Sequence, residues 1–127
     1  MKVAVIGDRN IDDVDWVNYH LDMLEKSVSD TLTIISGGSK GVDSIAHEWA
    51  DANEFDFVLI KPYHMVDNKM DYSPRFFFTR NKQIIDNADY VLIVGSPEES
   101  GVQHALRYCR RRDKSFTHIE YDPSEIA

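Results

Sequence analysis

The chain has 127 residues, 43% of them hydrophobic and 28% charged, and its formal net charge at pH 7 is −8. This length suits a single domain over residues 1–127, and no apolar run approaches the roughly 20 residues that a membrane helix needs. The negative charge argues against nucleic acid as a partner, although a pocket with a local positive field could still hold a small anion. The single cysteine, Cys109, excludes an internal disulfide and fits a cytoplasmic protein.

The first predicted elements are a buried strand and an amphipathic helix. The continuous apolar run Val3–Ile6 is typical of a central parallel strand that is covered on both faces. Asp12 or Asp13 could cap the helix that follows. Its core stripe recurs at helical spacing and comprises Val14, Val17, Leu21, Leu24 and Val28. Trp16, Tyr19 and His20 fall off that stripe, and we expect them to be only partly covered.

The next elements are a second strand at Thr31–Ile35, a glycine-rich turn, a second helix and a third strand at Phe55–Ile60. The inward positions of the helix are Val42, Ile45, Ala46, Trp49 and Ala50. The segment 61–75 reads as a long irregular connection, which is either a lid over a ligand or a flexible excursion. Its candidate covering residues are Tyr63, His64, Met65, Tyr72 and Arg75.

The remaining elements repeat the alternation of helix and strand. A helix is predicted at Phe76–Asn87, a strand at Tyr90–Val94, a helix from about residue 101, a strand at Ser115–Ile119 and a polar tail at Asp122–Ala127. Their probable core residues are Phe77, Ile84, Ile85, Ala88, Val102, Ala105, Leu106 and Cys109. Strands that alternate with helices imply right-handed βαβ units. We therefore expect an α/β fold, a Rossmann-like three-layer sandwich with a mainly parallel sheet of about five strands.

Three glycine-containing turns follow the first, second and fourth predicted strands, so they should meet at one rim of the sheet, where ligands of such folds bind. The turn 36–41 carries three glycines and opens directly into a helix, which favours an anion site, most plausibly for a phosphate. The candidate ligand-binding residues of this rim are Gly7, Arg9, Ser36, Gly37, Gly38, Lys40, Gly41, Asp43, Arg80, Asn81, Ser96 and Gly101.

Several common sites are poorly supported. Only Gly7 is present where a dinucleotide fingerprint would need three glycines, and Lys40 precedes Gly41 in an order that no P-loop has. Metal-ligand spacing and a nucleophile elbow are absent, so we expect no metal, and no cofactor is evident. Two roles stay open: Arg80 is a buried fork for an anion or reaches to solvent, and Asp43 binds ribose hydroxyls or caps a helix. His47 is expected to be structural.

Three stretches, Val3–Arg9, Ile35–Ala50 and Arg80–Asp89, resemble the SLOG superfamily, most closely its small YspA-like branch of bacteria and phages. The resemblance runs from Met1 to about Ile119. It implies a Rossmann-like fold and relatives that include LOG-type nucleoside-monophosphate phosphoribohydrolases, the single-strand-binding DNA-processing protein A and proposed sensors of nucleotide-derived signals. It also implies ligand contacts at Gly37, Gly38, Gly41, Asp43, Arg80 and Asn81, and a possible homodimer.

One departure from that family bears on catalysis. Where LOG enzymes have P-G-G-x-G-T-x-x-E, the segment Ser96–Ala105 keeps only Gly101, and Ala105 stands at the position of the catalytic glutamate. Alanine cannot activate water or stabilise an oxocarbenium ion. Glu98 or Glu99 could substitute from the loop, yet these acids and Asp8 would also repel a phosphate in the turns.

The function expected from the sequence is therefore the binding of a nucleotide or nucleotide-derived small molecule at the carboxyl-terminal rim of the sheet. Two alternatives remain open. One is a nucleotide N-glycosidic-bond hydrolase, for which Glu99 and Asp43 are the weak catalytic candidates. The other is a protein or single-stranded-DNA interaction module that uses the basic end of the last helix, Arg107 with Arg110–Arg112 and Lys114.

Overall fold

The computed structural model describes the backbone of residues 1–61, 64–66, 69–71 and 74–126, and the side chains of 1–61 and 76–126. Its elements in chain order are β1 (Lys2–Gly7), α1 (Val14–Ser27), β2 (Thr33–Ser36), α2 (Val42–Ala52), β3 (Asp56–Leu59), β4 (His64–Val66), β5 (Lys69–Asp71), α3 (Pro74–Asp86), β6 (Tyr90–Val94), α4 (Ser100–Arg111), β7 (Phe116–Ile119) and the short 3₁₀ helix η1 (Pro123–Ile126).

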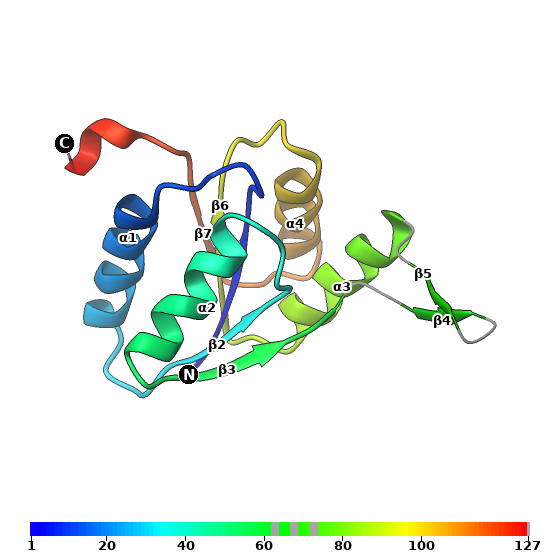
Figure 1. Ribbon diagram of the computed structural model, residues 1–127, viewed down its shortest axis with the longest axis horizontal. Coiled ribbons are helices and arrows are strands. Elements are labelled where there is room, and N and C mark those ends of the chain that lie inside the picture. Colours follow the sequence, from blue (N-terminus) through cyan, green and yellow to red (C-terminus); the bar gives the residue numbers. More distant parts are fainter. Residues whose placement is uncertain (62–63, 67–68, 72–73, 127) are drawn as a thin grey trace.

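The main sheet has five strands in the order β3-β2-β1-β6-β7, and every neighbouring pair is parallel. From β1 the chain runs outward through β2 to β3 and then crosses to β6 on the other side of β1 (Figure 1). The strand order therefore reverses between β1 and β6, the place where open α/β sheets bind ligands. The expected Rossmann-like α/β class is confirmed.

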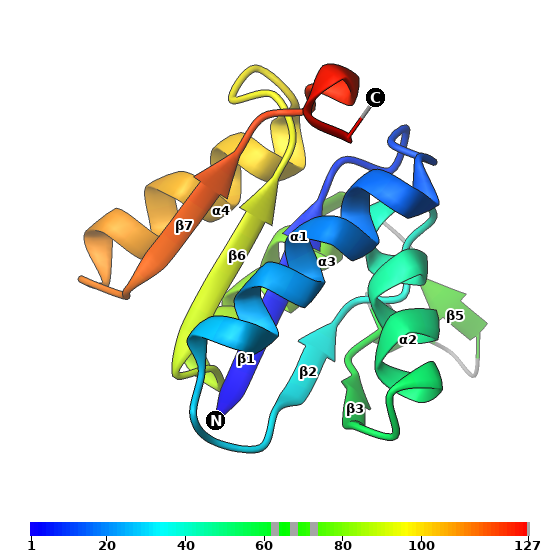
Figure 2. The ribbon, with the colours of Figure 1, turned by 90° about the vertical axis from the view of Figure 1, so that its left-hand side faces the viewer.

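The residues of β1 divide the core into two halves by simple alternation. Val3 and Val5 pack with α1 and α2 on one face of the sheet, whereas Ala4 and Ile6 pack with α3 and α4 on the other. Figure 2 shows α1 and α2 in front of the sheet with α4 and α3 behind it. Because both faces are covered, the central strands read as unbroken apolar runs.

The prediction for the first helix was wrong at two positions. Asp13 does cap α1, since its carboxylate accepts a hydrogen bond from the Trp16 amide at 3.2 Å. However, Trp16 is fully buried while Val14 is 46% exposed. The C-terminal tail explains why Trp16 is buried. The ring of Tyr121 packs edge-on against that of Trp16, with 4.9 Å between the ring centres, and Glu125 accepts a hydrogen bond from the indole nitrogen of Trp16.

The segment predicted to be irregular contains an antiparallel hairpin. Strands β4 and β5 pair with His64 opposite Asp71, and Figure 1 shows the hairpin beyond the N-terminal end of α3, away from the main sheet. The expected lid residues, Tyr63, His64, Met65, Tyr72 and Arg75, lie outside the residues whose side chains are described. A lid therefore stays a prediction.

Two further observations concern the thiol of Cys109 and the character of the helices. Cys109 is fully buried, as expected, and burial raises the pKa of its thiol to about 11, so at neutral pH it is not a thiolate nucleophile. Among the described residues, no helix combines the length and the apolar character needed to span a membrane.

Candidate ligand-binding site

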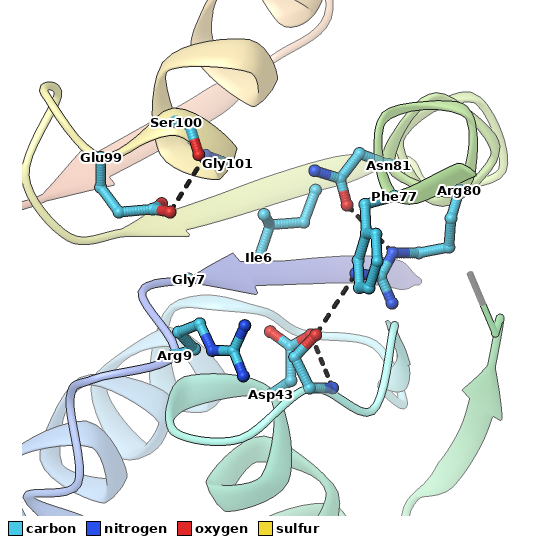
Figure 3. Close-up of a pocket in the computed structure, with 11 residues that line it drawn as sticks. Ile6, Gly7, Arg9, Asp43, Phe77, Arg80, Asn81, Glu99, Ser100 and Gly101 are labelled. Atoms are coloured by element: carbon cyan, nitrogen blue, oxygen red, sulfur yellow. Dashed lines mark hydrogen bonds between the residues drawn. The ribbon is translucent and has the colours of Figure 1, made fainter. Parts of the chain in front are cut away.

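A pocket of about 300 Å³ lies at the carboxyl ends of the strands, beside the reversal of strand order. It is lined by Ile6, Gly7, Arg9, Ser39, Asp43, Phe77, Arg80, Asn81, Glu99, Ser100 and Gly101. Figure 3 shows Glu99 and Ser100 toward one end of this pocket and Arg80 with Phe77 toward the other. The turns after β1, β2 and β6 thus meet in one place, together with the first half of α3.

Arg80 is a buried guanidinium with protein partners on all three nitrogens. Its Nη1 donates to the carbonyl of Gly37 at 2.6 Å, its Nη2 to the hydroxyl of Ser39 at 3.3 Å, and its Nε to Oδ1 of Asn81 at 3.1 Å. The side chain is 5% exposed, and the guanidinium lies 5.5 Å from the centre of the Phe77 ring. Burial lowers the pKa of Arg80, and the negative charge of Asp43 opposes this effect. Arg80 thus does not reach to solvent but fastens α3 to the glycine turn.

Two glycines of that turn leave space that other residues of the protein occupy. A Cβ on Gly37 would overlap the guanidinium of Arg80. Gly41 has a φ of +75°, and a Cβ there would lie 2.6 Å from the backbone oxygen of Arg9. At these two positions the space expected for a ligand is filled by neighbouring protein atoms, because three segments of chain converge behind the pocket.

Asp43 is the most unusual group of the pocket. Its side chain is 5% exposed, and its Oδ2 accepts a hydrogen bond from the Ser39 amide at 3.3 Å. Its Oδ1 has no hydrogen-bond partner within the part of the chain that the structure describes. Burial raises the pKa of Asp43 to about 6, although the positive charge of Arg80 acts in the opposite direction, as do, more weakly, the nearby amides of Ser39 and Gly7 and the hydroxyl of Ser36. Asp43 does not cap α2, since the N-cap residue is Gly41 and no side chain caps this helix.

Glu99 occupies the start of α4. Its two carboxylate oxygens accept hydrogen bonds from the amides of Gly101 at 3.1 Å and Val102 at 2.8 Å, so Glu99 is the N-cap of this helix. We expected Glu99 only as a weak catalytic candidate. A local signal for its role was present in the sequence, because an acidic residue directly before a helical apolar pattern is typical of a helix start.

The structure brings together half of the candidate ligand-binding residues. Those that line the pocket are Gly7, Arg9, Asp43, Arg80, Asn81 and Gly101, and those that do not are Ser36, Gly37, Gly38, Lys40, Gly41 and Ser96. Ser36 is buried and donates to the Val5 carbonyl at 2.9 Å, Lys40 is exposed, and Ser96 lies in a neighbouring hollow with Asp8. Sequence reasoning did not propose Ile6, Ser39, Phe77 and Ser100 as pocket residues.

The acidic residues of the rim have different positions. Asp43 and Glu99 line the pocket, whereas Asp8 and Glu98 do not. Ala105, at the expected position of a catalytic glutamate, lies on the inner face of α4 and is fully buried in the core. Among the described residues, no three His, Cys, Asp or Glu side chains are placed to hold a metal ion together.

The parallel five-stranded sheet and the pocket at its point of reversal define a Rossmann-like α/β protein. The chain belongs to the YspA, cpYpsA-related SLOG family, whose model matches residues 1–64. The resemblance found in the sequence is thereby confirmed. Arg80, Asn81 and Glu99 lie beyond the matched residues.

Solved structures that share the fold include two DNA processing proteins A. DNA processing protein A from Helicobacter pylori, described by its single-stranded DNA binding mode, superposes with a TM-score of 0.75 and 21% identity. The same protein from Streptococcus pneumoniae gives a TM-score of 0.79 and 20% identity. These matches cover 97% and 96% of this chain but only 66% and 51% of those proteins, and at such identities they show a common fold alone. No curated protein matches the chain.

Proposed function

We propose that the pocket binds a nucleotide or a nucleotide-derived small molecule, with sugar hydroxyls donating to Asp43. The observation that carries this proposal is the unpartnered Oδ1 of Asp43 in a pocket at the strand-order reversal. A buried acceptor without a donor costs about 1–3 kcal/mol, and more when it is charged. A ligand that supplies the donor removes that cost, so the site favours hydroxyl-bearing molecules.

The other lining residues suit the remaining parts of such a ligand. The half-buried ring of Phe77 offers an apolar surface against which a base can pack. Arg9 is exposed, and Figure 3 shows its guanidinium on the side of the pocket where Asp43 lies. A guanidinium at this place is suited to a phosphate that remains near solvent. The side-chain amide of Asn81 adds a donor whose orientation is set by the bond from Arg80.

Isothermal titration with adenosine, AMP and ADP-ribose tests the proposal. The test variant is Asp43→Asn and its matched control is Asp15→Asn. Both aspartates are the second residue of their helix, but Asp15 is exposed and does not line the pocket. We expect saturable binding of at least one compound, an affinity loss of roughly 10- to 100-fold in Asp43→Asn and no change in Asp15→Asn. Absence of binding by the unmodified protein, or equal binding by both variants, would contradict the proposal.

A second candidate is interaction with single-stranded DNA or a protein. It is favoured by the fold shared with a protein described as binding single-stranded DNA and by the exposed Arg107 and Arg111 of α4. Fluorescence anisotropy of a labelled oligothymidine decides between the two. DNA binding that weakens with salt and is lost in the Arg107→Ala/Arg111→Ala variant, but unchanged in Asp43→Asn, supports the second candidate. DNA binding that requires Asp43 places the nucleotides of the strand in the proposed pocket.

A further inference from the structure

The start of α4 has the elements of an anion site, but the protein fills it. The helix begins at the carboxyl end of β6, and its first residues Ser100 and Gly101 line the pocket. Free amides and the helix dipole make such a start attractive to phosphate. Here the amides of Gly101 and Val102 each donate to one carboxylate oxygen of Glu99, at 3.1 and 2.8 Å.

We infer that Glu99 is a built-in anion that closes the α4 end of the pocket to phosphate and thereby determines which ligands the pocket accepts. This inference deepens the proposed function, since it assumes that the pocket receives a ligand. The independent sign of a ligand is the buried, unpartnered Oδ1 of Asp43 in the same pocket.

Two physical effects produce this selectivity. A phosphate at the start of α4 would need the amides of Gly101 and Val102, so the carboxylate of Glu99 would first have to leave them. Once displaced, that carboxylate would remain close to the phosphate and repel it. A neutral or cationic group that donates hydrogen bonds meets neither obstacle.

The charges therefore assign an orientation to the ligand. Glu99 and Asp43 present carboxylates to the pocket, while Arg9 and Arg80 present guanidinium groups. Arg80 uses all three of its nitrogens on protein partners, and Arg9 is exposed. A phosphate is accommodated best at Arg9, and the end of the ligand near α4 carries hydroxyl or amino groups instead.

The neighbouring Glu98 provides a matched control. It carries the same charge one residue earlier, but its side chain is exposed and does not line the pocket. Glu99→Ser removes the charge and keeps a residue that caps helices well through its hydroxyl. Glu99→Gln retains the length of the side chain and one acceptor oxygen, so it guards against a loss of folding in the serine variant.

The experiment is a titration with inorganic phosphate, followed through the amide NMR signals of Gly101 and Val102. We expect no saturable shift in the unmodified protein or in Glu98→Ser. In Glu99→Ser we expect saturable shifts of both amides and an apparent affinity at least about tenfold higher, with Glu99→Gln between the two. Phosphate binding of equal strength with and without Glu99, or no binding in either Glu99 variant, would overturn the inference.

Inorganic phosphate separates this inference from the proposed function. If no nucleoside compound binds any variant but phosphate binds only when Glu99 is replaced, the proposed function fails and the role of Glu99 stands. If AMP binds the unmodified protein with both Gly101 and Val102 amides shifted as strongly as in Glu99→Ser, the pocket is functional but Glu99 does not exclude phosphate.

Discussion

Helices α2 and α4 both begin at the same rim of the sheet, yet their first turns are built in opposite ways. The start of α2 has Gly41 as its N-cap and no side-chain cap, whereas Glu99 caps α4 through two hydrogen bonds. At α2 the geometry depends on distant segments, because Arg80 reaches the Gly37 carbonyl from 43 positions away. At α4 the decisive contacts span only two and three residues.

This difference separates two ways of making a binding rim. Long-range packing holds the α2 turn in place and leaves the buried carboxylate of Asp43 with an open acceptor. At α4, the carboxylate of Glu99 accepts the hydrogen bonds of the first free amides, so these amides do not require a ligand as acceptor. The α2 side should therefore be intolerant of substitution and responsive to ligands, whereas the α4 side should be tolerant and selective.

The largest expected effect comes from replacing a glycine at each helix start. Gly41→Ala forces a side chain into a φ of +75° and to within 2.6 Å of the Arg9 backbone oxygen, so we expect a destabilisation of about 3 kcal/mol or more. In Gly101→Ala the nearest atom is Oε2 of Glu99 at 3.2 Å, the end of a flexible side chain, and alanine favours the helix. That change should stay within about 1 kcal/mol. Chemical denaturation measures both, and equal losses would remove the contrast between the two turns.

The next effect is a pH dependence that belongs to Asp43. Because burial raises its pKa from 3.8 to about 6, the folded protein holds this proton more tightly than the unfolded chain does. The stability that the protonated carboxyl contributes is fully present below the unfolded pKa and is lost as the pH rises through about 6. Asp43→Asn should thus become more stable than the unmodified protein, by up to about 3 kcal/mol, between about pH 4 and pH 7.

Urea denaturation across that pH range measures this difference, and Asp15→Asn serves as its control. The exposed Asp15 holds the same position in α1, so its replacement should shift stability by an amount that varies little with pH. A gap between Asp43→Asn and the unmodified protein that does not widen from pH 4 to pH 7 would show that burial of Asp43 is not what governs its titration.

A smaller effect is expected from removing the cap of α4. Glu99→Ala should destabilise the protein by about 1 kcal/mol, since the amides of Gly101 and Val102 lose their acceptor. Glu99→Ser should recover most of that loss, because serine caps helices through its own hydroxyl. Thermal denaturation distinguishes the two variants. Equal losses would mean that the carboxylate stabilises the helix by charge rather than by hydrogen bonding.

The elements that local patterns specify could be predicted from the sequence. The run Tyr90–Val94 is the strand β6 to the residue, and the inward face of α2 from Val42 to Ala50 is buried as expected. Apolar runs and helical spacing indicate which face of a segment is buried, and this does not depend on which other segment packs against that face. The meeting of three turns at one rim followed from the same alternation, since parallel strands end at the same edge.

The features that the sequence could not specify depend on partners far along the chain. The burial of Trp16 requires Tyr121 and Glu125 of the tail, and no periodicity within α1 contains that information. The environment of Arg80 depends in the same way on Gly37 and Ser39. Sequence reasoning could place these residues near the rim. It could not show that the space beside Gly37 would be occupied by the guanidinium of Arg80 rather than by a ligand.

The smallest expected effect concerns Lys40, the cation of the α2 turn, which the sequence favoured as a ligand contact. It is exposed and does not line the pocket, so Lys40→Ala should change stability by less than about 0.5 kcal/mol and leave nucleotide affinity unaltered. Arg9→Ala is its counterpart, because Arg9 lines the pocket and should contribute more to the binding of AMP than of adenosine. Titration of both compounds against both variants measures this. Loss of AMP affinity in Lys40→Ala but not in Arg9→Ala would show that the phosphate binds at the turn before α2. The N-terminus of α2, which no side chain caps, would then be the anion site, in contrast to the capped N-terminus of α4.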